Sequence, residues 1–167
     1  ENIDEVLYIR DKNGTISYIS PAVKRIFEHL PEEIVGHSIL GFVHPDDIDK
    51  VNEAATDGNQ GIHGSYQFRI VTKSGRTRWV NSSVHPILEK EGLIGIRGVL
   101  SDITERKRME DALRESQQLL ENILNTITVR VFWKDKDLVY LGCNTVFARD
   151  AGFEKPEDVI GKDDFAM

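Results

Sequence analysis

The sequence repeats part of its own opening, and this repeat limits how the chain can be divided. Residues 132–137 match residues 8–13 in their order of aromatic, apolar, basic and acidic side chains. The segment Pro156–Gly161 matches Pro31–Gly36 in the same way, with one residue inserted between the two matches. A chain of 167 residues has room for one domain of ordinary size plus an appendage, so the second copy is incomplete. We therefore divide the chain into a first domain (1–104), a linker helix (105–127) and the N-terminal part of a second copy (128–167).

The first domain is predicted to contain two strands, several short helices and three further strands. Asn13-Gly14 separates two β-rich runs, which is a strong hairpin signal. Ser20-Pro21 then predicts the N-cap and first residue of a short helix. From Gly64 to Leu100 apolar and polar residues alternate, and two polar turns divide this segment into three strands. This order predicts an α+β fold, with a five-stranded antiparallel sheet and short helices on one face.

Composition narrows the classes of partner. The net charge is −7, and Arg106–Arg108 is the one basic cluster, which argues against a nucleic-acid partner. No apolar run approaches the ~20 residues that span a bilayer, so we expect no membrane contact from this chain. Cys143 is the single cysteine, which fits a reducing, cytoplasmic compartment. Because the sequence begins at Glu1, we expect it to be part of a longer parent protein. Whether that parent has a membrane anchor is left open.

The linker is predicted to be a helix with a coiled-coil seam. Its apolar residues recur at heptad spacing, interrupted by two polar residues. The predicted seam residues are Met109, Leu113, Leu120, Ile123 and Ile127, with Arg106 and Ser116 as the polar defects. This pattern favours a homodimer formed through the linker, with dimerisation through the first domain as a second route. A lone amphipathic helix packed on its own domain is the alternative.

The sequence motifs, taken together and in order, resemble the PAS family of sensory domains. The matching segments are Tyr18–Ala22, Pro31–Gly36, His44–Asp47, Phe68-Arg69, Lys73–Gly75, Arg78–Val80, Gly95–Val99 and Asp102–Lys107. The resemblance implies a PAS-like sheet that encloses a pocket, usually within a sensor histidine kinase, a diguanylate cyclase or a similar regulator. It also identifies Asp102-Ile103-Thr104 with the joint through which such domains pass a signal to a following helix.

Three functions therefore stay open. The first is a non-catalytic signal-relay module of a prokaryotic sensor histidine kinase, which passes the state of a ligand or partner through the linker to a downstream output domain. The second is a structural dimerisation module without a ligand, and the third is a sensor module of a diguanylate cyclase. No convergent set of acid, base and nucleophile is recognisable, so we expect no catalysis by this chain itself.

Seven residues are the sequence candidates for a pocket in the first domain, because such pockets combine an apolar lining with a few polar groups. They are Phe42, Ile48, Val51, Phe68, Ile70, Trp79 and Asn81. The alternative is that these side chains only fill the core, without any ligand. The signal joint is assigned to Asp102, Thr104 and Arg106, and either Asp102 or Thr104 is expected to cap the linker helix.

Haem and flavin are not supported by the sequence, and an unidentified small molecule is left open. Haem-binding relatives take their histidine from the helix that here spans residues 47–57, which contains none; His44 is expected to cap a helix instead. Cys143 lies in the second copy rather than in the motif of flavin-adduct relatives, so we expect a half-buried structural thiol. The other histidines, His29, His37, His63 and His85, lack metal-ligand spacing, and no metal is predicted.

Overall fold

The structure is a computed structural model that describes residues 5–59, 64–90 and 92–166, without the side chains of 55–59. Its internal contacts divide the chain into two compact units, residues 1–108 and 109–167. Among the described residues, no helix is both long enough and apolar enough to cross a membrane.

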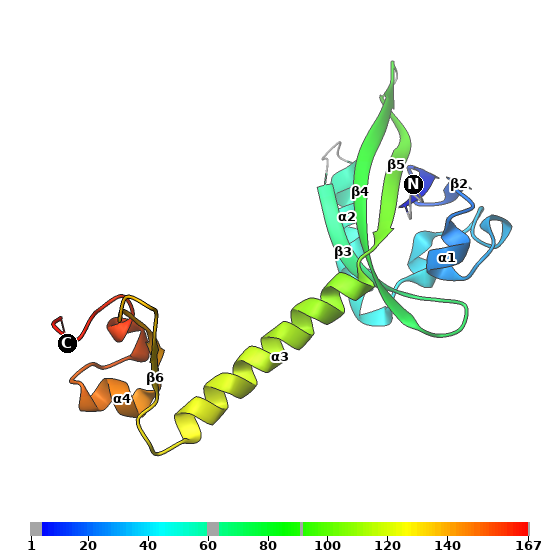
Figure 1. The fold of residues 1–167 in the computed structure, drawn as a ribbon. Coiled ribbons are helices and arrows are strands. Elements are labelled where there is room, and N and C mark those ends of the chain that lie inside the picture. Colours follow the sequence, from blue (N-terminus) through cyan, green and yellow to red (C-terminus); the bar gives the residue numbers. More distant parts are fainter. Residues whose placement is uncertain (1–4, 60–63, 91, 167) are drawn as a thin grey trace. The chain divides into compact units, whose positions relative to one another are not determined.

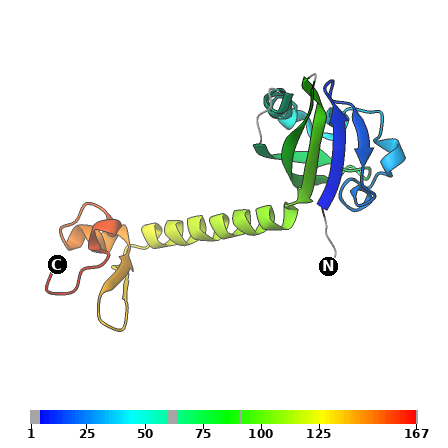
Figure 2. The ribbon, with the colours of Figure 1, turned by 90° about the horizontal axis from the view of Figure 1, so that it is seen from above.

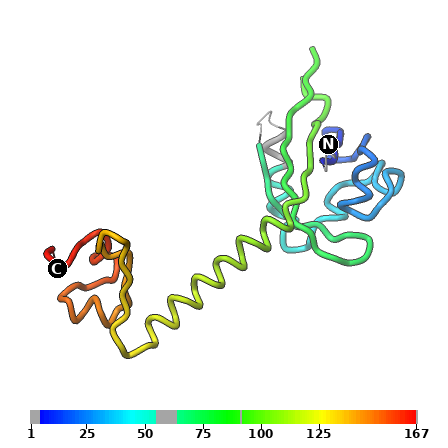
Figure 3. The backbone as a smooth tube through the Cα atoms, viewed as in Figure 1, coloured from blue at the N-terminus to red at the C-terminus, as the bar shows by residue number. Residues whose placement is uncertain are grey.

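A five-stranded antiparallel sheet forms the first unit, as the alternating sequence pattern predicts. Its order is β2-β1-β5-β4-β3, so the first and last strands of this unit lie side by side, blue next to green in Figure 2. The strands are β1 (Glu5–Asp11), β2 (Ile16–Ile19), β3 (Gly64–Val71), β4 (Thr77–Glu89) and β5 (Gly92–Asp102). The predicted α+β fold class is confirmed, and Figure 3 shows β4 and β5 extending past the ends of their neighbours.

Short helices fill the interval between β2 and β3 (Figure 1). They are α1 (Val23–Phe27), η1 (Pro31–Glu33), η2 (Ile39–Phe42), η3 (Pro45–Asp47) and α2 (Ile48–Asn59), the η elements being 3-10 helices. Helix α2 packs against β3, β4 and β5. The predicted cap at Ser20 was wrong: α1 begins at Val23, and the Ser20 hydroxyl instead accepts a 3.1 Å hydrogen bond from the Leu7 amide of β1.

The inner face of the sheet carries the core. On β4, Val80, Ser82 and Val84 are buried, whereas the residues between them are partly exposed. The same alternation buries every second residue of β1, and β5 contributes a glycine to the inner face at the position opposite Tyr8. That glycine, Gly98, gives room to the Tyr8 ring: a Cβ atom at Gly98 would lie 2.4 Å from two ring carbons.

We therefore predict that Gly98→Ala destabilises the first unit. The new methyl group overlaps the Tyr8 ring, and overpacking of this kind costs about 1–3 kcal/mol. Urea unfolding followed by core methyl NMR signals measures the change. Gly41→Ala is the matched control, since no atom lies within 4 Å of a Cβ atom at Gly41. An equal loss in both variants would contradict the role assigned to the Tyr8 contact.

The second unit contains a short hairpin followed by helices (orange and red in Figure 1). Its elements after the linker are β6 (Phe132–Lys134), β7 (Tyr140–Cys143), α4 (Thr145–Asp150) and the 3-10 helix η4 (Pro156–Val159). Several hydrogen bonds of this unit occur at positions that match the first unit. The Val131 amide donates to Asn144 as the Leu7 amide donates to Ser20, both at 3.1 Å. The Gly161 amide donates to Tyr140 at 2.9 Å, and the Gly36 amide donates to Ile16 at 2.8 Å. The Val139 amide donates to Asp135 at 3.0 Å, and the Thr15 amide donates to Asp11 at 2.9 Å.

The linker forms one continuous helix, α3 (Thr104–Thr126), within one residue of the predicted bounds. It contains neither glycine nor proline, so nothing in its sequence interrupts the backbone hydrogen bonds. None of its residues is buried. Its apolar side chains are therefore held by few contacts within the chain.

Candidate functional site

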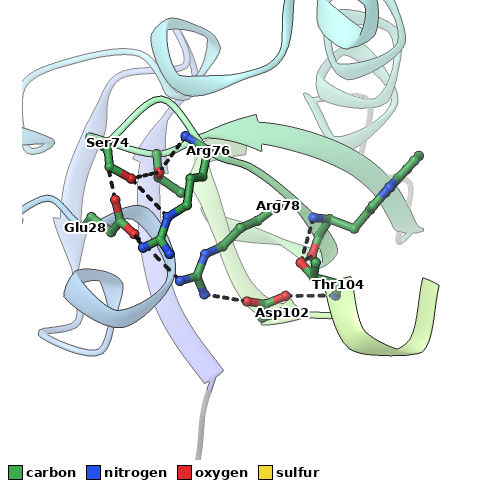
Figure 4. Close-up of polar contacts among 8 residues, drawn as sticks. Glu28, Ser74, Arg76, Arg78, Asp102 and Thr104 are labelled. Carbon is green, nitrogen blue, oxygen red and sulfur yellow. Dashed lines mark hydrogen bonds and ion pairs between the residues drawn. The ribbon is translucent and has the colours of Figure 1, made fainter. Parts of the chain in front are cut away.

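The joint between β5 and α3 is organised by the Asp102 carboxylate (Figure 4). One carboxylate oxygen accepts from the Thr104 amide at 2.8 Å, and the other accepts from Nη1 of Arg78 at 2.8 Å. Burial acts to raise the pKa of Asp102, but the hydrogen bonds from Thr104 and Arg78 outweigh it, so the pKa lies below its ordinary value. Asp102 is therefore the charged residue that caps the first turn of α3, which decides between the two predicted caps.

Thr104 has a different role, because its side chain faces β4. The hydroxyl accepts from the Trp79 amide at 2.9 Å and donates to the Trp79 carbonyl oxygen at 3.4 Å. The Ile103 amide donates to the same carbonyl oxygen at 2.9 Å. The start of α3 is thus attached to β4 through Thr104 and to β5 through Asp102, and it cannot turn without breaking one set of bonds.

The Trp79 ring connects the joint to β3 and to the residue before α2. The Arg69 guanidinium and the Lys107 ammonium each lie 5.6 Å from its ring centroid, which is cation–π distance. Arg69 in turn donates to both oxygens of Asp47, at 3.0 Å from Nε and 2.7 Å from Nη2. These hydrogen bonds lower the pKa of Asp47 to about 2. A continuous path of side-chain contacts therefore runs from the residue before α2 to the first turn of α3.

A second set of side-chain contacts joins α1 to Arg78 at the joint. Glu28 ends α1 in the left-handed conformation, with φ of 63°, and its carboxylate accepts from the Ser74 amide at 3.1 Å and from Arg76. It also lies 3.8 Å from Nη2 of Arg78, the residue that binds Asp102 (Figure 4). The hydrogen bonds from Ser74 and Arg76 lower the pKa of Glu28 to about 2. Arg78 is therefore shared between the α1 end and the joint.

The third predicted joint residue, Arg106, is exposed, and the residue of α3 that contacts Trp79 is Lys107. The predicted seam residues on α3 are strongly exposed. Their exposed fractions are 62% for Met109, 61% for Leu113, 58% for Leu120 and 47% for Ile123, while Ile127 follows the helix end and is partly buried. Leu119, which the heptad register leaves out, is also 60% exposed.

A cavity of about 50 Å³ lies inside the first unit, between α2 and the inner face of the sheet. The residues that line it are Tyr8, Arg10, Ile39, Val51, Ala54, Tyr66, Phe68, Ser82, Val84 and Leu100. Of the seven sequence candidates, Val51 and Phe68 line this cavity. Ile70 is fully buried in the core, and Phe42 and Ile48 pack against that core outside the cavity.

The prediction that Trp79 and Asn81 line the cavity was wrong by one position. Because side chains alternate along a strand, the burial of Val80 and Ser82 places Trp79 and Asn81 on the outer face. There the Asn81 amide oxygen accepts from the Ser65 hydroxyl at 2.8 Å. The sequence analysis missed two cavity residues on β1, Tyr8 and Arg10. They lie on the same face of the strand as the buried Val6, so the alternation of side chains along β1 could have predicted them.

The predicted structural roles of His44 and Cys143 fit the geometry. Nδ1 of His44 accepts from the Asp46 amide at 3.3 Å and caps η3, as expected. Cys143 is buried rather than half-buried as predicted, and burial raises the pKa of its thiol. Among the described residues no cluster of side chains has the composition of a metal site; His63 lies outside them.

Comparison with known proteins gives several partial matches. The White collar 1 protein of Neurospora crassa is 32% identical over 82 residues, covering 49% of this chain and 7% of that protein. A methyl sulfide methyltransferase-associated sensor of Methanosarcina acetivorans is 28% identical, covering 70% and 12%. A blue-light-activated histidine kinase of Brucella ovis is 33% identical, covering 54% and 18%. The chain thus spans less than a fifth of the length of these curated relatives.

Solved structures show the same fold. A sensory box histidine kinase/response regulator from Burkholderia thailandensis superposes with a TM-score of 0.59 at 29% identity, covering 71% of this chain and 92% of that one. The PAS domain of a Colwellia psychrerythraea protein gives 0.56 at 21% identity, covering 62% and 89%. The model of the PAS fold family matches residues 1–103. The chain therefore belongs to the PAS family, with its family domain in the first unit.

Proposed function

We propose that this chain is the sensory and relay part of a longer signalling protein. The first domain is the sensor, and the Asp102–Thr104 joint passes its state to α3. The observation that carries this proposal is the double attachment of α3, to β5 through Asp102 and to β4 through Thr104. A change in the sheet then alters the direction or stability of the helix, provided that two arrangements have similar energy. Substitution of Asp102 in the parent tests the proposal, because output should then stop following the signal.

A histidine kinase is the parent that the comparisons favour. The Brucella ovis relative carries that name at 33% identity, and so does the Burkholderia thailandensis structure at 29%. The N-terminal domain of a Marinobacter aquaeolei diguanylate cyclase superposes with a TM-score of 0.56, but at 17% identity this likeness concerns the fold alone. We propose that the catalytic step takes place in the downstream output domain of the parent. We also propose that this module lies in the cytoplasm.

The sensed input is proposed to be a small molecule or a partner rather than light or a haem ligand. The name of the Brucella ovis relative refers to blue light. In this chain the one cysteine, Cys143, lies outside the domain that matches the family, so no cysteine adduct can form in that domain. The sequence of α2 likewise contains no histidine that could bind haem iron from that helix.

We also propose that residues 128–167 are the beginning of a second PAS domain. The support is the set of matching hydrogen bonds in the two units, together with matching core positions: Ile16 and Tyr140 are both buried, and so are Ile34 and Val159. The residues that end the helical turns also match, since Gly36 and Gly161 have φ of 85° and 81°. On this proposal α3 connects two sensor domains in series.

Helix α3 is proposed to pair with a second copy of itself in a homodimer. Four of its five seam residues, all but Ile127, are about half or more exposed in the single chain, and burying them is favourable by about 25 cal/mol per Å². A structural dimerisation module without a ligand is the competing function, and it shares this contact. The two functions differ in whether the joint transmits a change.

The pairing predicts that Leu113→Glu raises the dimer dissociation constant at least tenfold. The substitution places a charge at an a position of the seam in both chains, where it loses apolar burial. Sedimentation velocity of the 167-residue chain over a concentration series measures the constant. Gln118→Glu makes a similar charge change at an f position of the same helix, and we expect little effect. Equal constants for the two variants would refute pairing along this seam.

A further inference from the structure

Asn144 joins the end of α3 to the strands and helices of the second unit. Its side chain is only 1% exposed, and all of its hydrogen-bonding positions are occupied. The amide oxygen accepts from the Val131 amide at 3.1 Å and from the Phe147 amide at 3.0 Å. The amide nitrogen donates to the Leu124 carbonyl oxygen at 3.1 Å and to the Val129 carbonyl oxygen at 2.9 Å. One buried side chain therefore contacts α3, the segment before β6 and the start of α4.

The bond to Leu124 lies in the last turn of α3. The last four carbonyl groups of a helix have no partner within it, and many helices end at a glycine whose backbone turns back to bond them. No glycine follows α3, because the next residues are Ile127, Thr128 and Val129. The Asn144 amide instead supplies a donor from outside the helix. The last turn of α3 thus depends on the folding of the residues that follow it.

The matching position of the first unit shows what the asparagine adds. Ser20 occupies that position, and its hydroxyl accepts from the Leu7 amide as the Asn144 oxygen accepts from Val131. A hydroxyl has one hydrogen to donate, whereas an asparagine amide has two hydrogens beside its acceptor oxygen. The shared bond therefore requires only the oxygen. The nitrogen half of the amide is the additional part, and it is the half that bonds Leu124 of α3.

We propose that Asn144 is the receiving joint of the relay, which couples the last turn of α3 to β6 and α4. This inference rests on the proposed sensory function and extends it to the far end of α3. If the last turn unwinds, the Leu124 carbonyl oxygen is lost as an acceptor and a buried N–H of Asn144 has no partner, which is unfavourable. The order of this turn and the packing of Asn144 are therefore linked, and such a linkage acts in both directions.

The first test separates the two halves of the amide in the 167-residue chain. Asn144→Asp keeps an oxygen that can accept from Val131 and Phe147, but an ionised carboxylate has no hydrogen to donate. We expect amide exchange at residues 125–127 to become at least tenfold faster, while exchange of the Phe147 amide changes less than threefold. Hydrogen exchange followed by NMR measures each amide. Equal acceleration at the two places would overturn the proposal, because it would show that Asn144 only stabilises the unit as a whole.

Asn144→Ser is the second variant, in case a buried carboxylate prevents folding. It introduces the side chain found at Ser20, which keeps an acceptor but loses at least one donor, and exchange at residues 125–127 should become at least threefold faster. Thr145→Val is the matched control. It removes another contact between α3 and α4, in which the Thr145 hydroxyl donates to the Asn125 side chain at 2.6 Å on the exposed surface. The control should change exchange less than twofold, and an effect equal to that of the Asn144 variants would refute the special role of the buried amide.

The signalling role is tested in the parent protein, with a variant whose Phe147 amide keeps its protection from exchange. Asn144→Asp or Asn144→Ser should uncouple output from the signal, as Asp102→Ala does, whereas Thr145→Val should not. If Asp102→Ala uncouples output and the Asn144 variants do not, the first joint stands and the receiving joint is wrong. If none of these variants uncouples output, the proposed relay itself is wrong, and the receiving joint is refuted with it.

Discussion

Replacing Asp47 with Asn is expected to lower the free energy of unfolding of the first unit by about 2 kcal/mol at pH 7. Asp47 is 9% exposed and accepts three hydrogen bonds from the backbone and side chain of Arg69. Breaking a fully buried ion pair costs roughly 3–5 kcal/mol, and the value is smaller here because the Arg69 side chain is 28% exposed. Urea unfolding, followed by the methyl NMR signals of the buried Ile70 and Val80, measures the loss.

Asp46→Asn is the matched control for this prediction. Asp46 is the adjacent carboxylate and also contacts Arg69, at 3.3 Å, but its side chain is 68% exposed. Exposed ion pairs of this kind contribute less than about 1 kcal/mol, so the control should lose at most a few tenths. Similar losses in the two variants would show that burial of Asp47 is not what makes its contacts with Arg69 strong.

The pH dependence of the Asp47 effect has a definite sign. The folded-state pKa is about 2, below the ordinary value of 3.8, so the folded state favours the charged carboxylate. Its stabilising contribution is complete above about pH 5 and is lost as the pH falls from about 4 to 2. The difference between wild type and Asp47→Asn should shrink over that range. Glu28 also has a lowered pKa, but it is present in both proteins, so its loss largely cancels in the difference.

Asp102→Ala is expected to increase amide hydrogen exchange in the first turn of α3 by about tenfold or more. The substitution removes the acceptor of the Thr104 amide and one partner of Arg78. An N-cap contributes about 1 kcal/mol and a charge-assisted hydrogen bond about 1.5–3 kcal/mol, and 1.4 kcal/mol corresponds to a factor of ten. In the full-length parent the output should no longer respond to the signal. Exchange mass spectrometry and an output assay measure the two effects.

Glu105→Ala is the control for the joint. Glu105 also places an acidic side chain in the first turn of α3, but it is exposed. Its interaction with the helix dipole is worth about 0.3–1 kcal/mol, so exchange should rise by less than about fivefold and signalling should persist. If Asp102→Ala behaved in the same way as this control, the joint would be an ordinary helix start without a signalling role.

The order of elements could be predicted from the sequence because it depends on local chemistry. The turn at Asn13-Gly14 and the alternation from Gly64 to Leu100 report conformations that neighbouring residues determine. The joint was assigned from the resemblance of Asp102-Ile103-Thr104 to the family's usual output joint, and its role in signalling stays a prediction. Which of Asp102 and Thr104 caps the helix depends on the angle between β5 and α3, and only the three-dimensional structure supplies that angle.

The inner and outer faces of β4 were the harder problem. Trp79 is the largest apolar residue of the strand, so burial in the cavity was the natural expectation. On the outer face its ring is instead covered by two cationic side chains, and sequence gives no sign of such a contact. Arg10 escaped prediction for the opposite reason, since arginine is rarely buried.

The position of Trp79 has a practical consequence. Its indole lies against Lys107 of α3, and its backbone is bonded to Thr104, so any movement of the helix start changes the electric field at the ring. The second tryptophan, Trp133, belongs to β6 and is exposed there. A chain with Trp133 replaced by phenylalanine therefore contains an intrinsic fluorophore at the joint, whose emission wavelength reports movement of the start of α3 without an attached dye.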